Sequence, residues 1–97
     1  MQKTFPLQLP GRVDARVVEA VKGDIRKYVK RERRKSLPEG FTQWNFACRA
    51  GPDTAAAVSC PVDGLSAAID AIVQAGGTSV YVEIMAQPGI REPAPRP

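Results

Sequence analysis

The chain has 97 residues, which is enough for one domain and too few for two. Its composition is 43% hydrophobic and 25% charged, as in ordinary globular proteins, and its formal net charge is +4. No apolar run is long enough for a membrane-spanning helix, and the first residues lack the apolar stretch of a signal peptide, so we expect a soluble cytoplasmic protein. The two cysteines, Cys48 and Cys60, fit that compartment, because a secreted chain of this size usually carries more disulfides.

Residues 3–9 form the first predicted strand. Apolar residues occupy every second position, as in a strand that is buried on one face: Phe5, Leu7 and Leu9. Pro6 has no N–H to donate to a strand ladder, so it requires an edge strand or an outward-facing position. Pro10-Gly11 is then expected to end the strand as a turn.

A long helix is predicted from Asp14, which suits an N-cap, to Lys35. Its apolar residues recur at helical spacing and cover an arc of about 120°. They are Val17, Val18, Val21, Ile25, Tyr28 and Val29. Basic residues occupy the opposite arc, and Glu32 stands where the apolar stripe would continue. We therefore expect the helix to outrun its core after Val29 and to project into water.

The segment 37–40, Leu-Pro-Glu-Gly, is typical of a helix stop followed by a turn. The next predicted strand covers residues 42–49, and its alternating apolar residues are expected beneath the helices: Trp44, Phe46 and Cys48. Gly51-Pro52-Asp53 predicts a hairpin turn. Residues 55–60 are expected to return as a short strand, although their alanine-rich composition supports a strand only weakly.

A second helix is predicted after Pro61, with Gly76-Gly77 at its end and apolar residues at helical spacing: Val62, Leu65, Ile69, Ile72 and Val73. Residues 78–85 form the last predicted strand, which places Val80, Val82 and Ile84 on one face and Tyr81, Glu83 and Met85 on the other. Residues 92–97 are rich in proline, and we expect a disordered tail there, outside a single domain of residues 1–91.

The resulting element order is βαββαβ. Two right-handed crossovers around a hairpin predict an α+β fold, the two-layer ferredoxin-like sandwich. Both helices are expected on one face of a four-stranded antiparallel sheet, with the first and third strands in its centre. The other face is expected to be open to solvent or to a partner.

Several stretches of the chain have distinctive sequences. The basic run of residues 30–35, Lys-Arg-Glu-Arg-Arg-Lys, is followed by the Leu-Pro-Glu-Gly of residues 37–40. Shorter pieces are Trp44-x-Phe46-x-Cys48-Arg49-x-Gly51 and the closing residues 81–91. Together they resemble a family of short bacterial proteins of unknown function, over residues 3–91. The resemblance implies a bacterial cytosolic protein, and it implies no activity and no catalytic or binding residue.

The basic residues are concentrated at the end of the first predicted helix. Of the 14 Lys and Arg, seven lie within residues 26–35, where Glu32 is the only acid, so this segment carries a charge of +6. The rest of the chain holds seven bases and nine acids, a net charge of −2. This asymmetry favours a polyanionic partner. The candidate contact residues are Arg26, Lys27, Lys30, Arg31, Arg33, Arg34 and Lys35.

The residues give little support to other chemistries. With no histidine and only two cysteines, the chain cannot build a typical four-ligand zinc site alone. It also has no glycine-rich phosphate loop, and it lacks a histidine that could act as a base near pH 7. We therefore expect no metal, no cofactor and no enzymatic activity. Asp63 and Asp70 are expected to be solvated and not a catalytic dyad. Tyr81 is the only ring expected on the open sheet face, which disfavours base stacking there. Cys48 and Cys60 are expected to face each other across the hairpin as reduced thiols.

We therefore expect a small non-enzymatic binding protein that contacts the phosphates of nucleic acid through the basic helix end. RNA is preferred over DNA by analogy with other small basic bacterial domains of this class. One alternative stays open. The chain would then be a protein-interaction or self-association module that uses the open sheet face or the edge of the strand at residues 42–49, with the basic helix end solvated.

Overall fold

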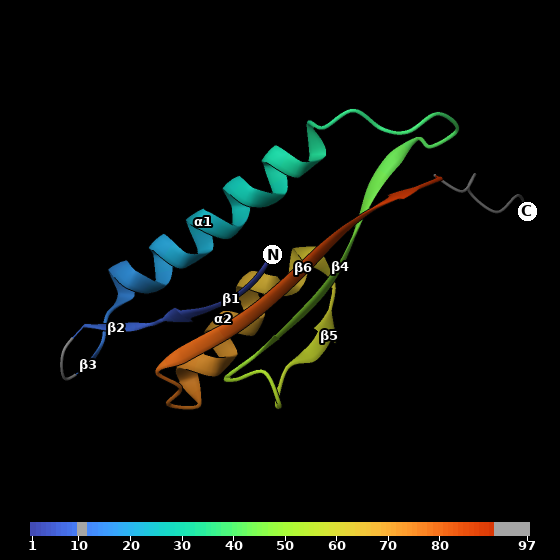
Figure 1. The fold of residues 1–97 in the computed structure, drawn as a ribbon. Helices are drawn as coiled ribbons and strands as arrows, with labels where there is room; N and C mark the ends of the chain where they lie inside the picture. Colours follow the sequence, from blue (N-terminus) through green and yellow to red (C-terminus); the bar gives the residue numbers. More distant parts are fainter. Residues whose placement is uncertain (10–11, 91–97) are drawn as a thin grey trace, which may run out of the picture.

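The computed structural model describes residues 1–9 and 12–90, and it has helices packed against one face of a sheet (Figure 1). The elements in chain order are β1 (Gln2–Pro6), β2 (Gln8–Leu9), β3 (Arg12–Val13), α1 (Ala15–Arg33), β4 (Gln43–Gly51), β5 (Val58–Cys60), the 3₁₀ turn η1 (Val62–Gly64), α2 (Leu65–Gln74) and β6 (Ser79–Gly89). The expected turn at Pro10-Gly11 and the expected tail at 92–97 lie outside the described residues.

The predicted α+β class with a four-stranded antiparallel sheet is confirmed, but a ferredoxin-like strand order is not. The strands follow one another in the order β1-β6-β4-β5, so that β4 and β6 are central, whereas the ferredoxin-like order places β1 and β5 in the centre. The reason lies in the strands themselves. β5 spans three residues and β1 carries Pro6, which cannot donate to a ladder, while β4 and β6 pair from Gln43↔Gly89 to Gly51↔Tyr81.

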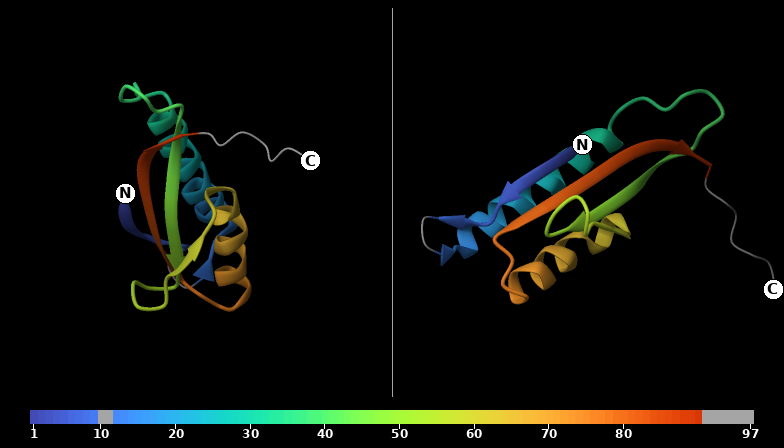
Figure 2. Two further views of the ribbon diagram at one scale, coloured as in Figure 1. Left: turned by 90° about the vertical axis from the view of Figure 1, so that its right-hand side faces the viewer. Right: turned by 60° about the horizontal axis from the view of Figure 1, so that its bottom comes forward.

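Both helices cover the same face of this sheet (Figure 2). Each helix connects two parallel strands that have a third strand between them, since β6 separates β1 from β4 and β4 separates β5 from β6. One core therefore collects apolar side chains from α1, α2 and the inner face of the sheet. Its most deeply buried members are Leu7, Leu65, Ile69, Val80, Val82 and Ile84.

Helix α1 begins as the sequence predicts. Asp14 is the N-cap, and its Oδ1 accepts a hydrogen bond of 2.8 Å from the backbone N–H of Arg16. The helical spacing of its apolar residues places one stripe against the core: Val18, Val21, Ile25 and Val29 are all buried. The helix ends at Arg33, with Arg34 as its C-cap.

The expected projection of the helix end into water is wrong, because the first half of β4 lies against it. Glu32 is only 8% exposed. The guanidinium of Arg33 lies 5.3 Å from the centre of the Phe46 ring. The indole N–H of Trp44 donates a hydrogen bond of 3.0 Å to the Lys35 carbonyl oxygen, which has no partner within a helix. The basic end of α1 is therefore held against the protein.

The outer face of the sheet is open over only part of its area. Residues 56–57 of the β4–β5 connection lie over Gly51, where a Cβ atom would stand 2.7 Å from the Ala56 oxygen. Arg49 donates a hydrogen bond of 3.0 Å to the Ala57 oxygen and so fastens this connection. Tyr81, which was expected as an available ring on this face, is only 8% exposed.

The β4–β5 hairpin is shorter than predicted but has the predicted register. Its second strand begins at Val58, not at residue 55. Cys48 pairs directly with Cys60, as the sequence predicts, and both are free thiols.

Candidate functional site

The seven predicted cations are all exposed, and α1 distributes most of them to two sides. One side, called the groove side, faces η1 and α2 and carries Arg26, Lys30, Arg33 and Arg34. The other side, called the β1 side, carries Lys27 and Arg31, which line a shallow hollow of about 350 Å³ together with Lys3. Lys35 follows the helix end. The predicted residues therefore form one band around the solvent half of the helix.

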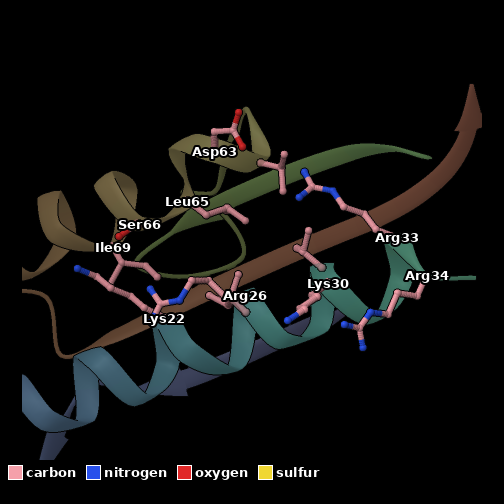
Figure 3. A pocket seen from close by; sticks show the side chains of 12 residues that line it. Lys22, Arg26, Lys30, Arg33, Arg34, Asp63, Leu65, Ser66 and Ile69 are labelled. Carbon is pink, nitrogen blue, oxygen red and sulfur yellow. The ribbon is translucent and has the colours of Figure 1, made fainter. Parts of the chain in front are cut away.

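The groove side borders a cavity of about 550 Å³ between α1 and the segment formed by η1 and α2. We call this cavity the interhelical groove. In Figure 3, Arg33 reaches from α1 toward η1, and Lys30 and Arg34 lie along the edge of α1 that faces away from α2. Leu65 and Ile69 lie on the wall that α2 provides. The apolar residues that line it are Ile25, Val29, Val62, Leu65 and Ile69. Sequence reasoning missed this groove, because its two walls come from helices whose spacing no local pattern encodes.

Three of the seven cations already have partners within the protein. Arg31 lies 5.5 Å from the centre of the Tyr28 ring, and Arg33 lies over Phe46. Lys35 forms an ion pair of 2.8 Å with Glu32. The hydrogen bond from Lys35 lowers the pKa of the Glu32 carboxyl group, so this acid stays ionised and neutralises part of the cluster.

The side chains of the remaining four cations have no hydrogen bond or ion pair within residues 1–9 and 12–90. They are Arg26, Lys27, Lys30 and Arg34. Binding an anion would cost these side chains no internal contact. They are therefore the part of the predicted site best suited to an external polyanion.

An ion pair joins the two helices at the closed end of the interhelical groove. Lys22 Nζ lies 2.6 Å from Asp70 Oδ1 and 3.7 Å from Glu19 Oε1. The hydrogen bond to Asp70 raises the pKa of the buried Lys22 ammonium. Asp70 was expected to be solvated; its side chain is half exposed, and it pairs with Lys22. Because its charge is neutralised internally, Lys22 positions the groove and does not add to its positive field.

On the outer sheet face, the Tyr81 ring is only 8% exposed and so is not available for base stacking. The Tyr81 hydroxyl donates a hydrogen bond of 3.1 Å to Glu83 Oε2, and Arg49 lies 3.5 Å from the same oxygen. Burial raises the pKa of Tyr81. This network fastens the sheet face and presents neither a base-stacking platform nor a positive patch.

The part of the chain that the structure describes contains no candidate metal centre. No group of three or more His, Cys, Asp or Glu side chains is placed to hold a metal ion there. Burial raises the pKa of both the Cys48 and the Cys60 thiol, which disfavours a reactive thiolate. Among the same residues, no helix has the length and apolarity needed to cross a membrane.

The comparisons with known proteins add a family and no activity. A family described as "Family of unknown function (DUF6172)" matches residues 1–94. No significant match was found among the curated proteins or among the solved structures.

Proposed function

We propose that this chain, which belongs to the DUF6172 family, is a non-enzymatic protein that binds nucleic acid through backbone phosphates at the basic end of α1. The observation that carries the proposal is the set of four exposed cations without an internal partner among the described residues, Arg26, Lys27, Lys30 and Arg34. Cations of this kind gain affinity for a polyanion by releasing its counterions. Following the family resemblance, the proposal places this binding in the bacterial cytoplasm.

The spacing of these cations suits a row of phosphates. Arg26, Lys30 and Arg34 stand at positions i, i+4 and i+8, which places them along about 12 Å of the helix axis. Phosphates of one strand rise about 3.4 Å per step along a duplex axis and also wind around it, so a straight row of this length spans about two phosphate steps. Lys27 borders the same row. The match supports contacts to one strand backbone.

The contacts are expected to be independent of base sequence. Arg31 and Arg33 cover two of the rings beside the cluster, Tyr28 and Phe46, and the half-buried Trp44 is held by its hydrogen bond to the Lys35 carbonyl oxygen. Base stacking would have to displace those guanidinium groups. RNA remains the preferred polyanion because of the analogy with small basic domains of this class. Affinity should therefore depend strongly on salt and weakly on sequence.

The test is a titration of labelled single-stranded RNA and duplex DNA at several salt concentrations. Four phosphate contacts predict slopes of log affinity against log salt of about −2.8 for a single strand and about −3.6 for a duplex. The variant Lys30→Gln/Arg34→Gln should flatten these slopes by about 1.4 and 1.8. Arg16→Gln/Arg96→Gln removes the same charge at two positions outside residues 26–35 and serves as the matched control. Absence of binding at low salt, or equal weakening by both variants, would contradict the proposal.

A second candidate is self-association through β4, and the strand pairing favours it. β5 covers only residues 48–50 of β4, so residues 43–47 pair with β6 alone and have a free edge. On the neighbouring strand β6, Met85 lies opposite Ala47 and is 46% exposed on the outer face. Scattering measurements over a range of concentrations test this candidate, because Met85→Lys should then lower the measured mass.

A further inference from the structure

The interhelical groove has the dimensions of a small-ligand site. Its volume of about 550 Å³ lies within the range of about 300–1,000 Å³ that is usual for such sites. Along α1 its lining runs from Lys22 to Arg34, about 18 Å of helix axis. The Lys22–Asp70 ion pair joins the two walls at one end. The groove is therefore long, and one of its ends is fixed.

The lining of the groove separates apolar from charged groups. The apolar residues are all aliphatic: Ile25, Val29, Val62, Leu65 and Ile69. Asp63 is the only acid among the lining residues. Four cations of α1 form one rim of the groove: Arg26, Lys30, Arg33 and Arg34. A ligand that fits both features has an aliphatic part and an anionic part.

Two other kinds of occupant fit the groove less well. A nucleobase gains its affinity by stacking on aromatic rings, and the lining contains none. An α-helix about 10 Å in diameter would fill this volume with little more than one turn, far from the roughly 800 Å² per partner of a stable protein interface. A single aliphatic chain is narrow enough to lie along the groove.

We infer that the interhelical groove binds an anionic amphiphile with one aliphatic chain. Its carboxylate or phosphate group contacts Lys30, Arg33 and Arg34 at the open end. The chain lies over Val29 and Leu65 and points toward the closed end at Lys22. This inference concerns the groove side of α1 alone and does not depend on nucleic-acid binding.

The positions of the cations favour this orientation of the ligand. Lys22, at the closed end, is neutralised by Asp70 and Glu19, so it adds little attraction for an anion there. The side chains of Lys30 and Arg34 have no hydrogen bond or ion pair among the described residues. The positive field of the groove is therefore strongest toward the open end, where the anionic group is placed.

The experiment measures binding of octanoate, decanoate and decyl phosphate to the full chain by calorimetry, below the concentrations at which they form micelles. Each added methylene that enters the groove should tighten binding by up to about fourfold. Decanol, which has the chain without the charge, should bind at least tenfold more weakly than decyl phosphate. Vesicles that contain phosphatidylglycerol form a further arm, which separates a soluble amphiphile from a membrane surface.

Two pairs of variants locate the site. Val62→Ser should weaken decanoate binding severalfold, and Val58→Ser, the same change at a 66% exposed position outside the groove, should leave it unchanged. Lys30→Gln/Arg34→Gln should weaken binding at least tenfold. Lys27→Gln/Arg31→Gln removes equal charge from the β1 side and should change binding less than twofold. Melting curves show whether each variant is folded. If Val62→Ser fails to fold, the comparison of the two charge-pair variants tests the location of the site.

The outcomes separate this inference from the proposed function. Three results would overturn the inference, since each indicates unspecific attraction to the basic surface. They are an affinity that does not change with the length of the aliphatic chain, an equal loss of decanoate affinity in the two charge-pair variants, and binding to vesicles alone. Decanoate binding with the expected variant pattern supports the groove even where RNA fails to bind. RNA binding without decanoate binding leaves the proposed function in place and overturns this inference.

Discussion

The ion pair between Lys22 and Asp70 should respond unequally to loss of its two partners. Asp70→Asn leaves the Lys22 ammonium, whose side chain is only 10% exposed, with Glu19 at 3.7 Å as its remaining anion. Lys22→Met removes the buried charge and keeps the apolar stem of the side chain. Asp70 is then left with half of its side chain in water, which solvates the carboxylate. Asp70→Asn should therefore destabilise the protein more than Lys22→Met does.

The magnitude follows from the exposure of the two partners. A hydrogen bond to a charged group contributes about 1.5–3 kcal/mol, and solvent screening at half-exposed Asp70 reduces this contribution. We expect Asp70→Asn to lower the free energy of unfolding by about 1–2 kcal/mol and Lys22→Met by less than about 1 kcal/mol. The double variant should resemble Lys22→Met, so the coupling energy of the pair should equal the effect of Asp70→Asn, about 1–2 kcal/mol.

Urea unfolding of wild type, the two single variants and the double variant measures these free energies. Circular dichroism and the fluorescence of Trp44, the one tryptophan of the chain, serve as two probes. The pKa of Lys22 is raised in the folded protein, so its contribution is complete below the ordinary value of 10.5 and is lost as the pH rises through the folded pKa. The difference between wild type and Asp70→Asn should therefore narrow in strongly alkaline solution. If Lys22→Met lowered the free energy of unfolding as much as Asp70→Asn does, the reasoning would be refuted.

Two further predictions concern glycines and thiols. Gly51→Ala should cost about 1–3 kcal/mol of unfolding free energy, because its Cβ would stand 2.7 Å from backbone atoms of Ala56 and Ala57. The control, Gly23→Ala, should raise the unfolding free energy by about 0.5–1 kcal/mol, since only the end of the Arg26 side chain lies within 4 Å of its Cβ. Both are measured by urea unfolding, and equal effects would contradict the contact argument. The two free thiols should be alkylated more slowly in the folded protein than in urea, because burial raises their pKa values, and equal rates in a timed iodoacetamide reaction would contradict this.

The elements of the fold could be predicted from the sequence where one local signal sufficed. Asp14 before an apolar stripe gave the start of α1, and the pairing of Cys48 with Cys60 followed from the centre of the hairpin. The strand order could not be predicted in this way. Any of several orders satisfies the same alternation, and the observed one depends on the long pairing of β4 with β6. That pairing is a contact between segments distant in the chain, which periodicity does not encode.

The same distinction explains what the sequence could say about the candidate site. The run of cations was visible because charge is a property of single residues, and their exposure followed from the helical wheel. Their division into a groove side and a β1 side requires η1 and α2 to lie beside α1, which only the tertiary fold provides. The contact of Arg33 with Phe46 and the hydrogen bond from Trp44 to the Lys35 carbonyl oxygen are equally hidden, because both rings come from a strand that follows later in the sequence. Sequence alone thus assigned seven equal cations, whereas the fold separates them by the partners that they already have. A variant that changes all seven at once would mix these effects, so the paired substitutions on the two sides of α1 are the informative ones.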